Sequence, residues 1–300
     1  MLYSINHESS ANTTYICGQF FEYSALLHVP TFKVSTSVFV QTPKAVHYDH
    51  DVHILAMSDI GSKSRTLKQC LIEDAKSLDI PSIGRSLGEW LANLHLWGRT
   101  KAAAPLRAVL TQNKELANVG IEYAFKSLVP SDDPLWQQVR SHVDNLRSLD
   151  NNDSDFIVHG DFCTGNVLVS GQGNTQLTIL DWETSNCRNF AWNDIGQMCS
   201  EMYQPTFFGH AGNLGAEMVS AFMKGYLSKK ELSDEERRLA VVRFGVHLFV
   251  WPRVTGWGNK ESVAKGQKLG REYIERGWNY DWEWLKDSVV RDLVPKKYFT

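Results

Sequence analysis

The chain has 300 residues, of which 43% are hydrophobic and 22% are charged. These proportions are typical of a soluble globular protein, and a chain of this length can bury a large core without disulfide or metal cross-links. Its 31 basic and 34 acidic residues give a net charge of −3, which argues against a nucleic-acid-binding surface. No apolar run approaches the roughly 20 residues that span a bilayer, and the first residues show no secretory signal. We therefore expect a cytoplasmic protein with no nucleic-acid or membrane partner.

In the N-terminal fifth of the chain, the pattern of apolar and polar residues predicts one short helix followed by strands. Phe20–Leu27 suits a helix. Val34–Val40 alternates apolar and polar residues, which is typical of a strand. Val46–Met57 then holds two short apolar runs separated by a turn at Tyr48–Asp51.

From about residue 63 the hydrophobic period becomes helical. Capping residues and prolines mark where the helices begin and end. The predicted helices begin after Ser82, at Pro134 and at the capping box of Ser233 and Glu236, the last one stopping at Pro252, and a further helix covers Lys260–Arg276.

A small β element interrupts this helical region. Phe156–Val158, Val167–Val169 and Leu177–Leu180 are short apolar runs. The polar, glycine-bearing stretch Ser170–Thr175 joins the last two and predicts a hairpin. The residues best suited to chemistry cluster on this element.

Asp161 and Asn166 lie five residues apart on a predicted tight loop, and Asp181 returns to the same place after the hairpin. Two carboxylates and an amide oxygen are hard ligands that suit Mg²⁺ held together with substrate phosphates. A carboxylate that is not bound to the metal, such as Asp161, could accept a proton from a substrate hydroxyl. His159 could tie the loop through its ring nitrogens or take part in catalysis directly. Glu183 could assist a second metal or only cap a turn.

The residues His-Gly-Asp at 159–161, Asn166 and Asp-Trp-Glu at 181–183 resemble the catalytic segment of the aminoglycoside phosphotransferase and choline kinase-like family. That family has a protein-kinase-like fold. Weaker similarities occur in the family's order, so the resemblance covers roughly residues 20–200. They lie in Phe21–Leu27 (regulatory-type helix), His53–Gly61 (last small-lobe strand and hinge), Ser86–Arg99 (helix after the hinge) and Asn189–Met198, where Asp194 would brace the catalytic loop.

The resemblance implies a role for each matched position. Asp161 would be the catalytic base, aided by His159, while Asn166 and Asp181 would hold Mg²⁺ on the phosphates of ATP. Glu22 would take the place of the glutamate that pairs with a strand lysine near the nucleotide. The backbone groups that would meet the adenine belong to Ser58, Asp59, Ile60 and Gly61.

The chain departs from the family pattern before Glu22. The family has a glycine-rich loop and a strand lysine there, whereas the first basic residue of this chain is Lys33, and Gly18 is the only glycine before it. Lys33 or Lys44 could supply the cation from another place. We therefore expect an α+β, two-lobed kinase-like fold, with a reduced N-terminal lobe and hinge over residues 1–62. A helical C-terminal lobe over residues 63–300 would carry the catalytic loop and hairpin.

Two functions follow from these observations. The first is phosphorylation of a hydroxyl on a small molecule by an ATP- and Mg²⁺-dependent transferase. The second is nucleotide-independent acid–base chemistry on an apolar metabolite, such as cyclisation, dehydration or isomerisation, performed by the same fold without a phosphate loop. A silent binding protein is disfavoured by the complete Asp161, Asn166 and Asp181 set. The ten tryptophans, several of them from Trp251 onward, suggest an aromatic or amphipathic substrate.

Overall fold

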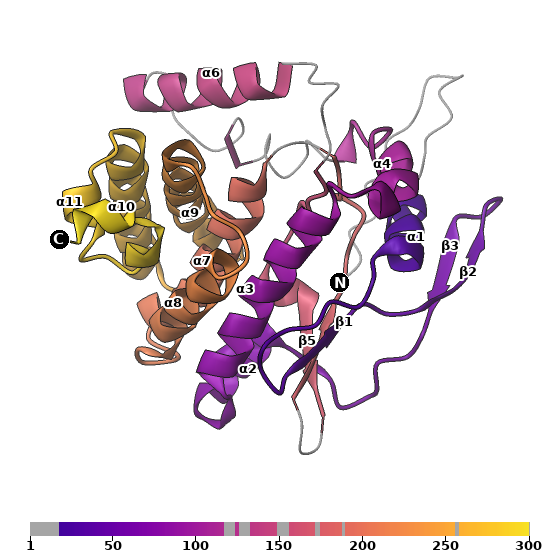
Figure 1. Ribbon diagram of the computed structural model, residues 1–300. Coiled ribbons are helices and arrows are strands. Elements are labelled where there is room, and N and C mark those ends of the chain that lie inside the picture. The colour runs from indigo at the N-terminus through magenta and orange to yellow at the C-terminus, as the bar shows by residue number, and fades with distance from the viewer. Residues whose placement is uncertain are drawn as a thin grey trace.

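The computed structural model describes residues 18–116, 124–125, 133–148, 156–171, 175–187, 190–255 and 258–299. Helices dominate it, and a small amount of β structure lies at one side (Figure 1). The α+β prediction is therefore confirmed. None of the described helices is long and apolar enough to cross a lipid bilayer.

The N-terminal part contains the predicted helix and hairpin. The strand predicted over Val34–Val40 is shorter than expected, since only its last two residues enter a strand. The elements are helix α1 (Gly18–His28) and strands β1 (Phe39–Gln41), β2 (Ala45–Asp49), β3 (Ile54–Met57) and β4 (Arg65–Thr66).

Within the described residues, the rest of the chain is mainly helical and contains the predicted hairpin. The helix predicted to begin after Ser82 begins earlier, at Ile80, because Asp79 is its N-cap. The capping box of Ser233 and Glu236 begins α9, but Pro252 does not end it, because the helix continues to Thr255. The elements are α2 (Leu67–Glu73), α3 (Ile80–Trp97), α4 (Ala104–Leu110), α6 (Pro134–Ser148), β5 (Val167–Ser170), β6 (Gln176–Ile179), α7 (Ala191–Phe207), α8 (Leu214–Leu227), α9 (Asp234–Thr255), α10 (Lys260–Trp278) and α11 (Trp282–Leu285).

A four-stranded sheet joins the N-terminal part to the predicted catalytic hairpin. Its strand order is β1-β6-β5-β4, and β2 and β3 form a separate hairpin. β5 and β6 are antiparallel, while β1 runs parallel to β6 with Phe39 opposite Gln176 and Gln41 opposite Thr178. The strand that leads to Asp181 is therefore paired on both of its edges.

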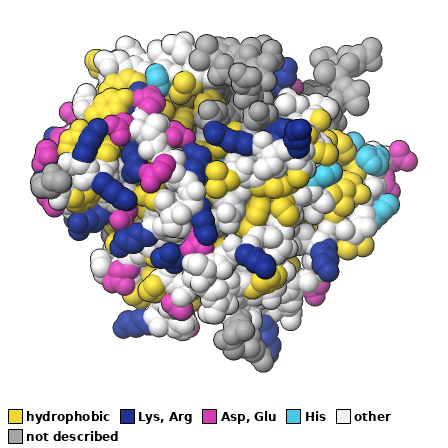
Figure 2. Space-filling model, in the orientation of Figure 1, with side chains coloured by type: hydrophobic (Ala, Val, Ile, Leu, Met, Phe, Trp, Pro, Cys, Tyr) yellow, Lys and Arg dark blue, Asp and Glu magenta, His cyan; other side chains and the backbone are white. Residues whose placement is uncertain are grey.

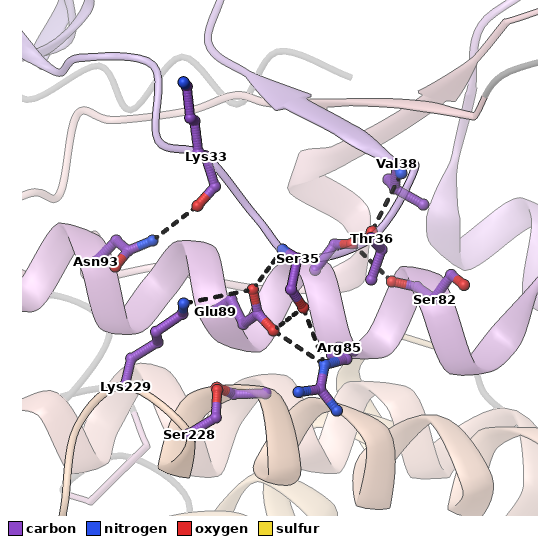
Figure 3. A network of polar contacts seen from close by, with 12 residues as sticks. Lys33, Ser35, Thr36, Val38, Ser82, Arg85, Glu89, Asn93, Ser228 and Lys229 are labelled. Atoms are coloured by element: carbon purple, nitrogen blue, oxygen red, sulfur yellow. Dashed lines mark hydrogen bonds and ion pairs between the residues drawn. The ribbon is translucent and has the colours of Figure 1, made fainter.

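The segment before β1 is held on helix α3 by a buried carboxylate (Figure 3). The side chain of Glu89 is only 1% exposed and accepts hydrogen bonds from the backbone nitrogen of Ser35 at 2.7 Å and from its hydroxyl. Arg85 adds a third bond to Glu89 at 3.0 Å. Burial acts to raise the pKa of Glu89, but the bonds from Ser35 and Arg85 outweigh it and lower this pKa. The carboxylate therefore stays ionised and fixes where β1 begins.

The β2–β3 hairpin rests on helix α1 and leaves apolar side chains exposed. The buried ring of Tyr48 stacks on Tyr23 of α1 with ring centroids 5.3 Å apart. Val46, Val52 and Ile54 are each more than half exposed. Figure 2 shows hydrophobic and histidine side chains gathered on the same side of the molecule as this hairpin in Figure 1. The hairpin therefore contributes little to the main core.

Helices α3 and α8 pack unusually closely, and glycines make this possible. A Cβ atom at Gly88 would lie 2.0 Å from the carbonyl oxygen of Phe222 and 2.7 Å from the backbone nitrogen of Tyr226. Both of these atoms belong to helix backbone and cannot move independently. The close contact brings Tyr226 beside His95, which supports the catalytic loop as described below.

We expect Gly88→Ala to destabilise the protein by at least about 1–3 kcal/mol, because it forces the α3 and α8 backbones apart. Gly266→Ala on α10 is the matched control. The atoms nearest to its Cβ are ring carbons of Phe207 and Phe208 at 3.3–3.8 Å, so a gain in helix propensity of about 0.5–1 kcal/mol can offset the contact. Urea unfolding of both variants measures the difference, and equal effects would contradict the packing argument.

Candidate active site

The hairpin brings the three predicted site residues to one place. Asn166 ends a short 3₁₀ turn over Thr164–Asn166, and its side-chain amide donates to the carbonyl oxygen of Asp161 at 3.0 Å and to Oδ2 of Asp161 at 3.1 Å. The backbone nitrogen of Leu180 donates to the carbonyl oxygen of Asn166 at 2.9 Å. Asp181 follows directly with a left-handed backbone (φ +65°), which turns the chain out of β6.

The buried carboxylate of Asp194 holds the start of the loop that carries Asp161. Asp194, near the start of α7, accepts hydrogen bonds from the backbone nitrogens of His159 at 2.8 Å and Gly160 at 2.9 Å. The Nε2 atom of His95 lies 3.3 Å from Oδ2 of Asp194, and the hydroxyl of Tyr226 bonds to Nδ1 of His95 at 2.8 Å. The predicted bracing contact of Asp194 is therefore present, and α3 and α8 support it from behind.

The geometry of His159 favours the bracing role over direct catalysis. Its side chain is fully buried, and Nε2 lies 3.0 Å from the carbonyl oxygen of Leu180. The backbone nitrogen of Asp161 donates to Nδ1 at 3.4 Å. Burial lowers the pKa of His159, so the ring is neutral and can donate from Nε2 while Nδ1 accepts. Its two nitrogens therefore tie the loop to the hairpin.

Carboxylates crowd around Asp181. Burial, followed by the charges of Asp161, Glu183 and Glu22, raises the pKa of Asp181 from its ordinary 3.8 to about 7, against an opposing hydrogen bond from Asn166. Burial also raises the pKa values of Glu22 and Glu183. The charges of Asp161, Glu183 and Glu22 thus all disfavour an ionised Asp181, and the negative charge around Asp181 is incompletely compensated by the protein.

This excess negative charge suits a divalent cation. Asp181 and Asn166 offer the carboxylate and amide oxygens that Mg²⁺ accepts, and phosphate oxygens and water usually complete its six ligands. Within the described parts of the chain, no group of three or more His, Cys, Asp and Glu side chains is arranged to hold a metal. The oxygens of Asp181 and Asn166 would suit an ion that is bound together with a phosphate-bearing substrate.

Glu22 contacts the catalytic hairpin directly. Its Oε1 atom accepts a hydrogen bond from the backbone nitrogen of Asp181 at 3.1 Å, and a backbone bond from Trp182 also lowers its pKa against the effect of burial. The described contacts of Glu22 include neither Lys33 nor Lys44. Lys33 lies on the segment beside α3, and Figure 3 shows its side chain extending away from Glu89.

The predicted hinge residues follow β3 at the edge of the N-terminal part. The backbone nitrogen of Ser58 donates to the carbonyl oxygen of Lys44 at 2.9 Å. The Ser58 hydroxyl in turn accepts from the backbone nitrogen of Lys44 at 3.0 Å. Asp59 accepts from the backbone nitrogen of Gly61 at 2.9 Å, and Gly61 has a positive φ of 99°. The turn that carries Ile60 is therefore held by hydrogen bonds of its own and neighbouring residues. Its contact with adenine remains a prediction.

The tryptophans late in the chain mostly pack against other parts of the protein. Trp282 is buried, Trp284 contacts Tyr273 with ring centroids 5.2 Å apart, and Trp278 lies under the guanidinium of Arg238 at 4.4 Å. These contacts account for much of the C-terminal aromatic density without a ligand.

A family model described as the phosphotransferase enzyme family matches residues 22–240. The chain belongs to this family. The match and the α+β architecture confirm the predicted kinase-like fold class and the prediction of an enzyme. Two curated members are related in sequence: 4-hydroxytryptamine kinase from Psilocybe cyanescens, 25% identical over 84% of this chain and 72% of that protein, and phosphotransferase FrzJ from Cladobotryum sp., 21% identical over 84% of this chain and 69% of that protein.

Three solved structures are similar to this chain at 12–16% identity. A microcompartment-associated aminopropanol kinase has a TM-score of 0.46 over 96% of this chain and 86% of that one. An ethanolamine kinase from Plasmodium vivax has a TM-score of 0.45 over 89% and 73%. A choline kinase from Cryptosporidium parvum has a TM-score of 0.42 over 80% and 75%.

Sequence reasoning missed the residues behind Asp161. The side-chain amide of Gln197 donates to Oδ1 of Asp161, and Arg243 donates to Oε1 of Gln197 at 2.6 Å. Gln197 follows Asp194 by one helical turn, which was the available signal for its placement. Arg243 lies in an otherwise apolar stretch of α9, where a lone arginine could have been recognised as a buried charge.

In the absence of Mg²⁺, we expect the contribution of Asp181 to stability to fall as pH rises from about 4 to 7, because its raised pKa makes this group bind more protons in the folded state than in the unfolded chain in that window. Asp181→Asn removes this charge, and Asn tolerates the left-handed backbone. It should stabilise the metal-free protein at pH 8 by on the order of 1–3 kcal/mol.

Urea unfolding in EDTA at pH 5 and pH 8 measures this effect. Exposed Asp287→Asn serves as the control and should change neither value. A lower stability of Asp181→Asn than of the wild type at pH 8 would show that the carboxylates do not repel one another.

Proposed function

We propose that this phosphotransferase moves the γ-phosphoryl group of ATP to a hydroxyl of a small molecule, with Mg²⁺ as cofactor. The observation that carries this proposal is the convergence of Asp161, Asn166 and Asp181 beside a surplus of negative charge. Membership of the phosphotransferase family supports it. Phosphoryl transfer needs positioning and charge neutralisation more than covalent work by the protein, and the site supplies fixed oxygens for both.

Each residue then has one task. Asp161 accepts the proton of the acceptor hydroxyl as that oxygen bonds to the γ-phosphorus, while the bond between this phosphorus and the oxygen bridging to the β-phosphate breaks and ADP leaves. Asn166 and Asp181 would hold Mg²⁺, which neutralises charge on the phosphate oxygens. Glu22 fixes the backbone at Asp181, and His159 fixes the loop. The turn over Ser58–Gly61 would meet the adenine.

For the acceptor, we propose a hydroxylated aromatic or amphipathic molecule. The name of the relative from Psilocybe cyanescens states that it acts on 4-hydroxytryptamine, an aromatic compound with a ring hydroxyl. A phenol-type hydroxyl loses its proton more readily than an alkyl one, so a single carboxylate such as Asp161 can serve as its base. A cytoplasmic location suits a supply of ATP.

We expect millimolar MgATP to raise the unfolding temperature of the wild type by several degrees, since a ligand at about 100 times its Kd stabilises by roughly 2.7 kcal/mol. Asp181→Asn should lose the Mg²⁺-dependent part of this shift. Asp161→Asn should keep the shift but lower kcat by about 10²–10⁴. Phosphoryl transfer is followed with labelled ATP and a panel that includes 4-hydroxytryptamine, ethanolamine and choline, with Asp287→Asn as the control.

The absence of both a thermal shift and transfer in the wild type would overturn the proposal.

Glu22 accepts backbone hydrogen bonds at the position where the family pattern places a lysine-paired glutamate. That contact is the observation that favours a second candidate function, in which Asp161 performs acid–base chemistry on an apolar metabolite without a nucleotide. Turnover of such a metabolite that is abolished by Asp161→Asn and unaffected by ATP would favour it.

A further inference from the structure

A seam of buried polar side chains runs between helices α7 and α9. Asn193, Gln197 and Glu201 recur every four residues on α7, and Arg243 and His247 do so on α9. Each of these five residues is at most 5% exposed. Residues four apart lie on the same helix face, so the two rows face each other across the contact.

Arg243 is the centre of the seam. Its Nε donates to Oδ1 of Asn193 at 2.7 Å, its Nη2 donates to Oε1 of Gln197 at 2.6 Å, and its Nη1 lies 3.4 Å from Nδ1 of His247. A guanidinium only donates hydrogen bonds. The oxygens of both amides must therefore face Arg243, which leaves both NH₂ groups pointing the other way.

Those NH₂ groups both reach the catalytic loop. Nε2 of Gln197 donates to Oδ1 of Asp161, and Nδ2 of Asn193 donates to the carbonyl oxygen of Gly160 at 3.3 Å. Since Asn166 already donates to Oδ2 of Asp161, both carboxylate oxygens of the base are engaged. The orientation of the Asp161 side chain is thus set from two sides, one of which depends on Arg243.

The other end of the seam grips the same loop farther along. Nε2 of His247 lies 2.8 Å from Oε1 of Glu201, and the hydroxyl of Thr164 donates to Oε2 of Glu201 at 2.9 Å. Burial lowers the pKa of His247 to about 4. The neutral ring can therefore accept from Arg243 at Nδ1 and donate to Glu201 at Nε2.

We propose that Arg243 is a positioning residue for the catalytic base, acting through Gln197 to fix the carboxylate of Asp161 for proton transfer. This inference rests on the proposed phosphotransferase function. Arg243 is a buried cation whose closest described partners are neutral amides, and such a charge is rarely favourable for stability alone. Burial lowers its pKa to about 10, with Asp161, Asp194 and Glu201 opposing the shift, so it remains charged at neutral pH. An orienting role explains why it is there.

Gln197→Glu tests the chain of contacts without removing a partner from Arg243. The new carboxylate can still accept from the guanidinium, but it cannot donate to Asp161. We expect kcat to fall by about 10–100-fold, with KM for ATP and acceptor within about 3-fold of the wild type, because proton transfer is impaired and binding is not. A folded Gln197→Glu variant with wild-type kcat would overturn the proposal.

Arg243→Met and Arg243→Lys test the centre of the seam. Lysine restores charge but not the fork that holds both amides, so it should recover stability more than kcat. The double variant Arg243→Met with Gln197→Leu is the safeguard against unfolding, since it removes the Gln197 amide together with the guanidinium that this amide faces and so leaves fewer unpaired buried groups than Arg243→Met alone. Its kcat should be as low as that of the worse single variant. Ser200→Ala is the matched control, because Ser200 is fully buried on α7, the helix of Gln197, and its hydroxyl has no hydrogen-bond partner among the described residues.

Hydrogen exchange of the peptide covering residues 156–167 gives a readout that needs no turnover. Exchange in Arg243→Met should rise about tenfold, while that in Ser200→Ala should match the wild type. Unchanged exchange in Arg243→Met would overturn the positioning role whether or not the enzyme is active. A wild type that transfers no phosphoryl group would instead overturn the proposed function, and the two failures are therefore separable.

Discussion

The arrangement of the site depends on the buried carboxylate of Asp194. It accepts the backbone hydrogens of His159 and Gly160, so the loop that presents Asp161 is held by a charge-assisted contact from the first turn of α7. His95 and Tyr226 approach Asp194 from α3 and α8, and the glycine-mediated contact between those helices places them. The packing of helices α3 and α8 therefore helps to determine the position of the loop that carries Asp161, and the core and the site stabilise each other.

Local sequence patterns determined the elements that could be predicted. The hairpin over residues 167–179, helix α1 and the capping box of α9 all follow from turn, period and cap residues that are neighbours in sequence. Pro252 was predicted to stop α9, yet its missing hydrogen bond is tolerated in the last turn before Thr255. Residues 34–38 were predicted as strand because they alternate, but Glu89, more than fifty residues away, holds them on α3 instead. Residues 1–17, which precede Glu22 where the family pattern has a glycine-rich loop and a strand lysine, lie outside the described residues.

The site residues divide in the same way. Asp161, Asn166 and Asp181 could be predicted because their spacing is set by one loop and one hairpin. The contact between Gln197 and Arg243 could not be predicted, since it depends on how α7 and α9 pack. The crowding of Glu22 and Glu183 against Asp181 likewise appears only in three dimensions. The sequence pattern contains the residues that we propose to react. Folding adds the surrounding negative charge, which would favour a cation, and the donors that hold the carboxylate of Asp161.

The parallel pairing of β1 with β6 has a mechanical consequence. The segment between α1 and β2 is held at two places. Ser35 is bonded to Glu89 of α3, and β1 pairs with β6, the strand that precedes Asp181. Helix α1 is tied to the same region, because Glu22 accepts the backbone hydrogen of Asp181. Among the described residues, the β2–β3 hairpin forms a separate two-stranded sheet and packs on α1 through Tyr48. The backbone at Asp181 is therefore tied directly to α1 and, through β6 and β1, to the segment clamped on α3.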